Sequence, residues 1–414
     1  MAESSQPVLI DASLLSRYIE ALGTIGWQPQ GGVVRPVYSP AWVQAREQLA
    51  QWMRAAGLEV YGDAVGNLFG RLRGSEEGGT ILTGSHFDTV PFGGIFDGTL
   101  GILAGLVALR ALREQAGQPR RDLEVVALCE EEGSRFEAHY WGTRAMQGLI
   151  GADELERLRD EQGMSIAEAM RDVGLSPERY REAVRRDLEA FLELHIEQGR
   201  VLYEEGIQVG IVEAIVGLHH RQLSVRGRAD HAGTTPMDMR RDALQGAAHM
   251  AIEITRLVEQ EGRPAVVTLG KWSVKPGAVN VVPEEVSFSI DVRHPDEDTK
   301  QRLVAAMLAR CETIARERGL ALSSEITHES RPGKMDAALQ SALMQAAETC
   351  GASWKVMPSG AGHDSQEMAR HLPTAMLFVP SQEGRSHSAA EYTSPQEAAL
   401  GATVLATALY RLAY

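Results

Sequence analysis

The 414-residue sequence contains only three cysteines, Cys129, Cys311 and Cys350, which lie far apart in the chain. So few cysteines, in an odd number, do not fit a disulfide framework and are typical of a reducing compartment. The sequence also lacks any run of about 18 uncharged apolar residues, so it predicts no membrane-spanning helix. Its first residues, MAESSQPVLIDASLL, lack the basic and apolar regions of a signal peptide. We therefore expect a cytoplasmic protein.

The sequence has no excess of positive charge. Lys and Arg total 41 against 56 for Asp and Glu, which gives a net charge of −15. This balance argues against binding of nucleic acid or of an anionic membrane, and it favours small solutes as partners. A length of 414 residues with 44% hydrophobic content predicts a globular protein of two or more domains. We find no internal repeat and no low-complexity segment.

Strands alternate with helices in the first half of the sequence. The run GGTILTGSHFD is typical of a strand, and GTLGILAGLVALRALREQ after it has the three- and four-residue apolar spacing of a helix. DLEVVALCEEEGSRF and LELHIEQG repeat the pattern of a buried strand that ends in polar residues. Between them, residues 151–190 are rich in Glu and Arg, which indicates solvated helices without a chemical role. These patterns predict the α/β class.

A different pattern begins near residue 213. Several alternating strand-like runs and helical patterns at about 240–260 and 297–318 predict a compact α+β domain. The α/β alternation returns after residue 330 and continues to a helix at the C-terminus. We therefore predict a first domain built from residues 1–212 and 330–414, interrupted by an inserted domain of residues 213–329.

Imidazole and carboxylate side chains recur where strands are predicted to end. Open α/β sheets place their binding crevices at these ends. The two residue types are the usual ligands of zinc and neighbouring divalent ions, and one carboxylate can bridge two ions about 3.5–4 Å apart. A single such residue is more often a loop cap, whereas recurrence at successive strand ends favours a metal site. The candidates are His86, Asp88, Asp97, Glu131, Glu132, His195 and His387.

The local spacing suggests separate roles for these residues. Asp88 follows His86 by two positions and can fix the tautomer of its ring. Asp97 lies among glycines, which allow close approach to a cation, so we expect its two oxygens to bridge two ions. Glu131 and Glu132 are adjacent acids that raise one another's proton affinity unless a cation is bound. One of them can bind metal while the other takes a proton from water, whose pKa falls to about 7 on zinc.

Eight motifs carry a resemblance to a known family. GSHFDTV, GGIFDGTLG, EEEGSRF, ELHIEQG, HAGTTPM, NVVPE, SGAGHDSQ and SHSAAE occur in this order. They resemble the amidohydrolase branch of the dinuclear metallopeptidase superfamily that contains aminoacylases and carboxypeptidases. The branch includes allantoate amidohydrolases, N-carbamoyl-L-amino acid hydrolases, β-ureidopropionases and ureidoglycolate amidohydrolases. The resemblance implies a metallopeptidase-like catalytic domain, with a mixed central sheet flanked by helices, and an inserted ferredoxin-like domain for lid and dimer functions.

The same resemblance implies roles for individual residues and a homodimer with two divalent ions per subunit. The ions would be zinc or manganese, with cobalt or nickel as alternatives. The implied metal ligands are His86, Asp97 as the bridge, Glu132, His195 and His387. Glu131 would be the general base, Asp88 would orient the first histidine, and His231 would stabilise the oxyanion in the neighbouring subunit. Asn280 and Arg293 would bind substrate, and Gln198, Gly360 and Gly362 would line the pocket. No family role fits His219 or His220, and His363 and Asp364 can equally be structural.

The resemblance leaves the substrate open among small ureido carboxylates. LGKWSVKPGAVNVVP, VMPSGAGHDSQ and the Arg293–His294 pair are closer to allantoate amidohydrolases, which places allantoate first and implies a role in ureide catabolism. Leu218 stands where those enzymes tend to have glutamine, which favours N-carbamoyl-L-amino acids as the next candidates. Ureidoglycolate and β-ureidopropionate are further alternatives. A dipeptidase or aminoacylase is less favoured because ELHIEQG and SRF resemble the amidohydrolase branch. An inactive binding protein is less favoured because every expected ligand and the base are present.

Overall fold

The structure, a computed structural model, describes residues 6–414 and divides into two compact units. The first unit runs to Glu213 and resumes at Lys334, and the second comprises Ala214–Gly333. These boundaries lie one and four residues beyond the expected ones, after residues 212 and 329. Within the described part of the chain, no helix combines the length and apolar character needed to cross a membrane.

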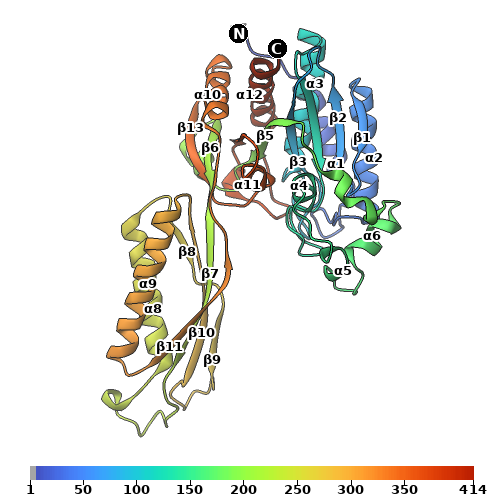
Figure 1. Cartoon of the computed structure of the whole chain (residues 1–414). Coiled ribbons are helices and arrows are strands. Elements are labelled where there is room, and N and C mark those ends of the chain that lie inside the picture. The colour runs from blue at the N-terminus through green and yellow to red at the C-terminus, as the bar shows by residue number, and fades with distance from the viewer. Residues whose placement is uncertain (1–5) are drawn as a thin grey trace. The chain divides into compact units, whose positions relative to one another are not determined.

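The first unit is built on a nine-stranded mixed sheet with the order β1–β2–β4–β3–β5–β14–β6–β12, in which β13 also pairs with β6 (Figure 1). Its strands are β1 (Glu59–Gly62), β2 (Leu68–Leu72), β3 (Thr80–His86), β4 (Asp122–Leu128), β5 (Leu188–Ile196), β6 (Val209–Ile215), β12 (Gly333–Lys334), β13 (Trp354–Ser359) and β14 (Thr374–Val379). Strands β4, β3, β5 and β14 are parallel to one another, whereas the β1–β2, β2–β4 and β14–β6 pairs are antiparallel. The predicted α/β class with a mixed central sheet is confirmed.

Both faces of this sheet are buried. Ile81 and Val125 belong to one hydrophobic cluster, whereas their chain neighbours Leu82 and Val126 belong to another, because successive strand residues point to opposite faces. Helices α1, α3 and α12 pack against one another, and α4 packs against α11. The helices of this unit are α1 (Ala12–Gly23), α2 (Pro40–Ala55), α3 (Thr99–Ala116), α4 (Trp141–Met146), α5 (Glu154–Arg157), α6 (Ile166–Asp172), η1 (Pro177–Ala183), α7 (Val201–Glu205), α10 (Ala337–Thr349), α11 (Asp364–Met368), η3 (Gln382–Gly384) and α12 (Pro395–Ala413).

The parallel strands bring distant polar residues to one edge of the sheet. His86 is the last residue of β3, and His195 is the next-to-last residue of β5. The acids of the EEEG sequence follow β4, which lies beside β3. Carboxyl ends of parallel neighbours share one edge, so these side chains are placed together. Gly98 precedes α3 with a φ of 62°, a left-handed conformation that glycine adopts without strain.

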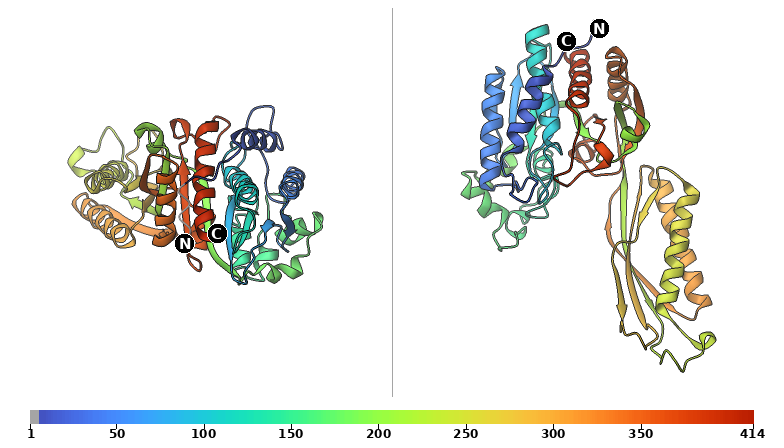
Figure 2. Two further views of the ribbon diagram at one scale, coloured as in Figure 1. Left: turned by 90° about the horizontal axis from the view of Figure 1, so that it is seen from above. Right: turned by 180° about the vertical axis from the view of Figure 1, so that it is seen from behind.

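The second unit is a five-stranded antiparallel sheet with two long helices. The strand order is β11–β7–β10–β8, and β9 pairs with β10. Alternate residues of β10 are buried against α8 and α9, which lie side by side along one face of the sheet (Figure 2). The elements are β7 (Gly217–Arg226), η2 (Met237–Met239), α8 (Ala243–Glu261), β8 (Val266–Thr268), β9 (Trp272–Lys275), β10 (Glu285–His294), α9 (Glu297–Glu317) and β11 (Ala321–Glu329).

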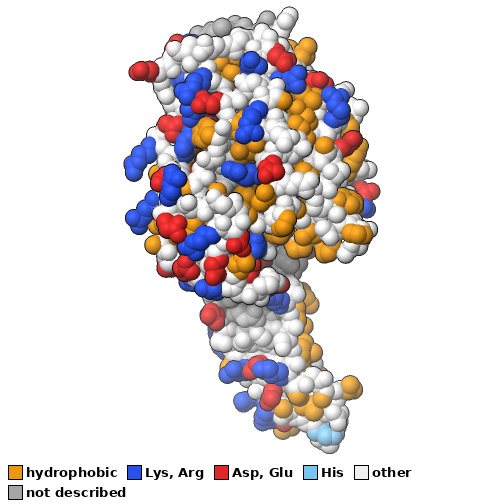
Figure 3. Space-filling model, turned by 90° about the vertical axis from the view of Figure 1, so that its right-hand side faces the viewer, with side chains coloured by type: hydrophobic (Ala, Val, Ile, Leu, Met, Phe, Trp, Pro, Cys, Tyr) orange, Lys and Arg blue, Asp and Glu red, His pale blue; other side chains and the backbone are white. Residues whose placement is uncertain are grey.

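Charged side chains of both signs are interspersed on the face of the molecule shown in Figure 3. No broad patch of Lys and Arg alone is visible among the described residues on this face.

Candidate metal centre

The centre of the site is Asp97, whose two carboxylate oxygens face different histidines. Oδ1 of Asp97 lies 3.4 Å from Nε2 of His86 and 3.2 Å from Nε2 of His195. Oδ2 lies 3.3 Å from Nε2 of His387, which is also 3.6 Å from Oε1 of Glu132. Two groups of potential ligands therefore share one carboxylate: His86, Asp97 and His195, and Asp97, Glu132 and His387.

The two strand-end histidines have defined tautomers. Nδ1 of His86 lies 3.1 Å from the backbone oxygen of Asp88, and Nδ1 of His195 lies 2.9 Å from that of Ile196. A carbonyl accepts only a hydrogen, so the proton of each neutral ring is on Nδ1 and its Nε2 carries a lone pair. The Gly98 N–H, which donates to Nε2 of His195 at 3.1 Å, agrees with this assignment. Both Nε2 atoms thus face Asp97 in the form that binds a metal.

The side chain of Asp88 contacts the backbone of Glu131 and Glu132 more closely than it contacts His86. Its Oδ1 accepts the Glu131 N–H and its Oδ2 accepts the Glu132 N–H, both at 3.1 Å. Oδ1 is 3.7 Å from Nδ1 of His86, which is closer to the Asp88 backbone oxygen. The side chain of Asp88 therefore positions the two acids, and its backbone positions His86.

Burial and neighbouring charges perturb the pKa values of Asp97, Glu131 and Glu132. Burial, together with the charge of Asp97, raises the pKa of Glu132 to about 7. Burial also raises the pKa of Glu131 well above its usual range, although His86 opposes this shift. Burial would raise the pKa of Asp97 too, but its contacts with the rings of His195, His387 and His86 hold it well below its usual range. Glu131 and Glu132 therefore bind protons more readily than usual, and a bound cation would replace those protons.

The neighbouring carboxylates in turn raise the pKa values of His387 and His86. The hydrogen bond to Asp97 raises the pKa of His387 to about 9, against the opposing effect of burial. Burial disfavours the charged form of His86, yet Glu131, Asp97 and Asp88 outweigh it and raise the pKa of His86 well above its usual value. Among the described residues, the ion-pair partners of Asp97, Glu131 and Glu132 are histidines alone. No fixed Lys or Arg neutralises these carboxylates, so the donor set fits divalent cations.

A third group of potential ligands, Glu193, His195 and His363, lies deeper. The Glu193 carboxylate accepts the hydroxyls of Ser85 and Ser365, both at 2.6 Å. His363 packs edge-on against His195, with ring centroids 4.5 Å apart, and its Nε2 is 3.0 Å from Oγ of Ser359. Because Glu193 and His363 already have hydroxyl groups as hydrogen-bond partners, we interpret this group as a structural support for the ring of His195.

Of the predicted pocket residues of the first unit, Gln198 contacts a candidate ligand directly. Nε2 of Gln198 donates to Oδ2 of Asp97 at 2.8 Å, which places this amide beside the expected bridge. A side chain at Gly362 would collide with the Tyr140 hydroxyl, whereas one at Gly360 would meet nothing within 4 Å. Tyr140 is a neighbour of the site that the sequence did not single out, because an isolated tyrosine outside the motifs gives no signal.

The other predicted residues belong to the second unit. His231 and Asn280 lie on adjacent loops, joined by a hydrogen bond from the Ala232 N–H to the Asn280 oxygen at 3.0 Å. Nδ1 of His231 accepts the Gly233 N–H at 3.0 Å, so a neutral ring carries its proton on the exposed Nε2. Arg293 lies elsewhere, on β10, where its Nη2 is 2.8 Å from Oδ2 of Asp291.

Three further residues of this unit bear on the sequence-based interpretation. Nε2 of His220 lies 3.2 Å from Oδ1 of Asp291, and Nδ1 of His219 lies 3.2 Å from Oε1 of Glu329. Both histidines are thus side chains of a sheet with local acidic partners. His294 is buried, and its Nδ1 accepts the Asp296 N–H at 2.9 Å, so it stabilises the turn before α9.

An α/β sheet with buried imidazole and carboxylate ligands at its strand ends is the framework of a metal-dependent hydrolase. Residues 82–411 match Peptidase family M20/M25/M40. The chain is 41% identical to an N-carbamoyl-L-amino acid amidohydrolase of Geobacillus stearothermophilus, over 98% of this chain and 99% of that one. It is 39% identical to an allantoate amidohydrolase of Bacillus subtilis, over 97% of each chain. A hydantoinase/carbamoylase family amidase from Burkholderia multivorans has a similar structure, with a TM-score of 0.92, 33% identity and 98% of each chain covered.

The chain belongs to Peptidase family M20/M25/M40, and it is a hydrolase of C–N bonds. The resemblance to the amidohydrolase branch is thereby confirmed. The relatives named above act on different substrates, so the family defines the class of reaction and leaves the substrate to be argued from the site.

Proposed function

We propose that the protein hydrolyses a ureido C–N bond in a small ureido carboxylate, with allantoate as the first candidate. The observation that carries the proposal is Asp97, whose Oδ1 faces His86 and His195 while its Oδ2 faces His387. A carboxylate shared in this way fits a site for two divalent ions. The similarity to an N-carbamoyl-L-amino acid amidohydrolase and to an allantoate amidohydrolase supports a ureido group as the bond that is cut.

Two divalent ions per subunit, zinc or manganese, are part of this proposal, with cobalt or nickel as alternatives. One ion would be held by His86, Asp97 and His195, and the other by Asp97, Glu132 and His387. Such ions polarise a carbonyl oxygen and lower the pKa of water. The buried acids fit this arrangement, because a cation would favour the charged form of Glu132, whose pKa burial and the charge of Asp97 raise to about 7.

Glu131 is the proposed general base. Its backbone is held by Asp88 at 3.1 Å, and its Oε2 lies 3.9 Å from Nε2 of His86, in a group of potential ligands that also contains Glu132. From there the carboxylate takes a proton from the water that attacks the ureido carbon. It then delivers that proton to the leaving nitrogen as the C–N bond breaks. A terminal carbamoyl group yields an amine, carbon dioxide and ammonia.

The second unit supplies the proposed contacts to substrate. Arg293 has the planar guanidinium that captures a carboxylate in two hydrogen bonds, and Asn280 offers an amide. The exposed Nε2–H of His231 is a donor suited to the developing oxyanion. We further propose a homodimer through this unit, in which His231 serves the site of the neighbouring subunit. Gln198, Gly360 and Gly362 would complete the pocket.

One observation favours a second candidate substrate. Leu218 is the cross-strand partner of Arg293 on β7, so an apolar side chain borders the proposed carboxylate contact. Side chains opposite one another in a sheet lie within contact distance. The second ureido arm of allantoate would find no hydrogen-bond partner in Leu218, whereas the side chain of many N-carbamoyl-L-amino acids would pack on it. N-carbamoyl-L-amino acids are therefore the second candidate.

A substrate panel tests the proposal. Ammonia release is measured with allantoate, N-carbamoyl-L-amino acids, ureidoglycolate and β-ureidopropionate, and amine release is measured with dipeptides and N-acyl amino acids. We expect ammonia from the ureido acids, with the highest kcat/KM for allantoate, and no amine from dipeptides. Glu131→Gln protein is the matched control. Amine from dipeptides without ammonia from ureido acids would show a peptidase, and no turnover of any compound by metal-loaded protein would show a binding protein.

A further inference from the structure

Glu391 joins the two loops that carry Asp97 and His387. Its Oε1 accepts the N–H groups of Phe96 and Asp97, both at 2.9 Å. Its Oε2 accepts the Ser386 hydroxyl at 3.1 Å, and the same Oγ lies 3.1 Å from Oδ2 of Asp97. Glu391 itself is 5% exposed. One buried carboxylate therefore contacts the backbone of Asp97 and Ser386, the residue before His387, although Asp97 and Glu391 lie almost 300 residues apart in the sequence.

The loop around Asp97 is shaped to receive this carboxylate. A side chain at Gly94 would collide with Oε1 of Glu391, so the backbone passes directly against the acid. The two N–H groups that Glu391 accepts belong to the residues just before Gly98 and α3, where the chain has no helical partner for them. Their hydrogen bonds fix the direction in which the Asp97 side chain leaves the backbone.

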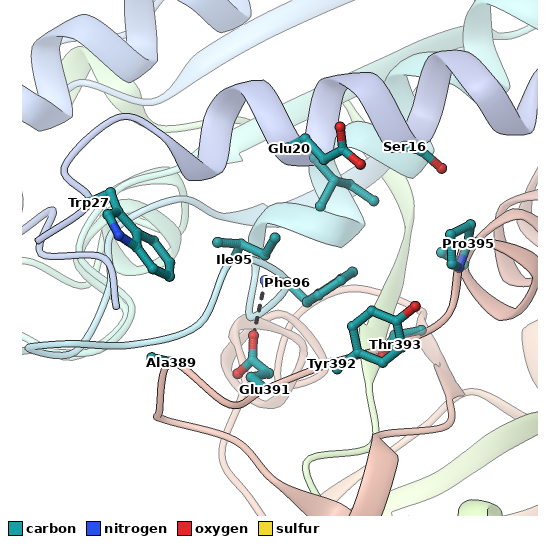
Figure 4. A pocket seen from close by; sticks show the side chains of 12 residues that line it. Ser16, Glu20, Trp27, Ile95, Phe96, Ala389, Glu391, Tyr392, Thr393 and Pro395 are labelled. Atoms are coloured by element: carbon teal, nitrogen blue, oxygen red, sulfur yellow. Dashed lines mark hydrogen bonds between the residues drawn. The ribbon is translucent and has the colours of Figure 1, made fainter. Parts of the chain in front are cut away.

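Side-chain packing also contributes to the position of this loop. Phe96 is buried in the main hydrophobic core, with its ring centroid 6.0 Å from that of Tyr392, and Ile95 packs against the same core. A pocket of about 320 Å³ adjoins the loop, lined by Trp27, Ile95, Phe96 and Tyr392 among others, with Glu391 in its wall (Figure 4). Figure 4 shows the Glu391 carboxylate directed at the Phe96 backbone. The apolar side chains hold the loop in the core, and the hydrogen bonds to Glu391 fix its backbone at Phe96 and Asp97.

The two groups of ligands depend on Glu391 to different degrees. His86 and His195 lie on β3 and β5 and are oriented by backbone carbonyls at 3.1 and 2.9 Å. His387 lies in a loop with a strained φ of 51°, and its side chain is half exposed. Its neighbour Ser386 is the residue that Glu391 contacts. The loss of Glu391 would therefore disturb the Oδ2 side of Asp97 and His387 more than the Oδ1 side.

We infer that Glu391 is a positioning residue, which sets the separation of Asp97 Oδ2 and His387 for the second divalent ion. The inference rests on the proposed two-ion site and identifies a residue that shapes the binding site of the second ion. Glu391 would touch neither ion nor substrate, because both of its oxygens are already engaged by backbone amides and a hydroxyl. Its effect is transmitted through Ser386 and the backbone of Asp97.

Metal titration tests the inference without reference to any substrate. Chelated wild-type, Glu391→Ala, Glu391→Gln and Ser386→Ala proteins are titrated with Zn²⁺ in a competing chelator buffer. We expect the wild type to bind two equivalents, and Glu391→Ala to bind one equivalent unchanged and the other about 10-fold or more weakly. Glu391→Gln keeps an oxygen for the two N–H groups and should lie closer to the wild type. Activity of Glu391→Ala should return as Zn²⁺ is raised.

Asp63→Asn is the matched control. Oδ1 of Asp63 also accepts backbone N–H groups of a loop, those of Val65, Gly66 and Asn67, but it contacts no ligand. It should lose stability and retain both equivalents. Wild-type affinities in Glu391→Ala, or equal weakening of both equivalents, would overturn the inference. If Glu391→Ala does not fold, unchanged affinity for both equivalents in Ser386→Ala would overturn it instead. A wild type that binds no Zn²⁺ would refute the two-ion proposal itself.

Discussion

The carboxylate of Asp88 holds the backbone of Glu131: its Oδ1 accepts the Glu131 N–H at 3.1 Å. Its other oxygen accepts the next N–H, that of Glu132, at the same distance. Asp88 is fully buried, so these charge-assisted hydrogen bonds form in a medium that strengthens them. The proposed base and a proposed ligand therefore have their positions set by one side chain from the neighbouring strand end.

Asp88→Asn tests this relationship. Asparagine presents one acceptor and one donor, so its NH₂ group would face one of the two backbone N–H groups that the carboxylate accepts. We expect activity to fall about 10- to 100-fold and the free energy of unfolding to fall by about 1–3 kcal/mol. The measurements are kcat/KM and denaturant unfolding of the metal-loaded protein. Full activity with an unchanged unfolding curve would show that Asp88 does not position the acidic loop.

Glu131 and Glu132 should be separable by their effects on turnover and on metal. Glu131→Gln should keep both ions and lower kcat about 100- to 10,000-fold, because only proton transfer is lost. Glu132→Gln should bind one equivalent poorly, because its carboxylate is a member of the group with Asp97 and His387. Elemental analysis and steady-state kinetics on both variants provide the comparison. The opposite pattern would require the roles of the two acids to be exchanged.

The pKa of His387 predicts a pH dependence for the metal-free protein. Its pKa in the folded state is about 9 instead of 6.5, because Asp97 stabilises the charged ring. The charged ring therefore stabilises the folded state fully below pH 6.5, and this contribution is lost as the pH rises through about 9. In chelated protein, the difference in melting temperature between wild type and His387→Asn should be largest near pH 6 and should shrink toward pH 9.5. A difference independent of pH would contradict the His387–Asp97 pair.

Much of the fold could be predicted from the sequence because its patterns are strong. The apolar run before His86 is a strand buried on both faces, and the run after Gly98 is a helix buried on nearly all sides. Alternating residues in β10 mark a sheet with one covered face. The C-terminal end of the inserted domain was harder to predict, because β11 is almost entirely exposed and lacks an apolar alternation to mark where the unit ends.

The site could be predicted in its residue types and less so in its contacts. Histidine and acid at successive strand ends led to candidate ligands that the structure brings together around Asp97. Spacing alone suggested that the Asp88 side chain serves His86, whereas the shorter contact comes from its backbone. Glu391 lay within the quoted SHSAAE motif, but its partners Phe96 and Asp97 are almost 300 residues away. Such long-range hydrogen bonds leave no local pattern in a single sequence.

Arg293 should contribute to substrate affinity. Replacing it with lysine removes the planar pair of donors while keeping the charge, so we expect kcat/KM for a ureido carboxylate to fall about 10- to 100-fold, mainly through KM. Arg226→Lys is the matched control, since Arg226 lies on the same sheet and pairs with Glu285 at 3.0 Å. Equal kinetics for wild type and Arg293→Lys would exclude this residue from the proposed carboxylate contact.

The proposed role of His231 across a dimer interface predicts that two inactive variants restore each other. His231→Ala subunits keep their own base, and Glu131→Gln subunits keep the histidine. A mixed dimer would therefore contain one complete site, in which Glu131 of one subunit meets His231 of the other. Random pairing of equal amounts puts about half of the dimers in the mixed state with one good site in two, so the ceiling is about a quarter of wild-type activity if sites are independent.

Subunit exchange must be verified, for example by mass spectrometry of differently tagged chains, and each parent measured alone should be nearly inactive. If His231 only stabilises its own turn, through the Gly233 N–H that its Nδ1 accepts at 3.0 Å, the single variant should lose little activity. An inactive His231→Ala protein that shows no recovery in verified mixed dimers would place the histidine in the site of its own chain. Recovery near the expected ceiling would establish both the dimer and the exchange of this residue, because neither parent subunit can supply the missing group by itself.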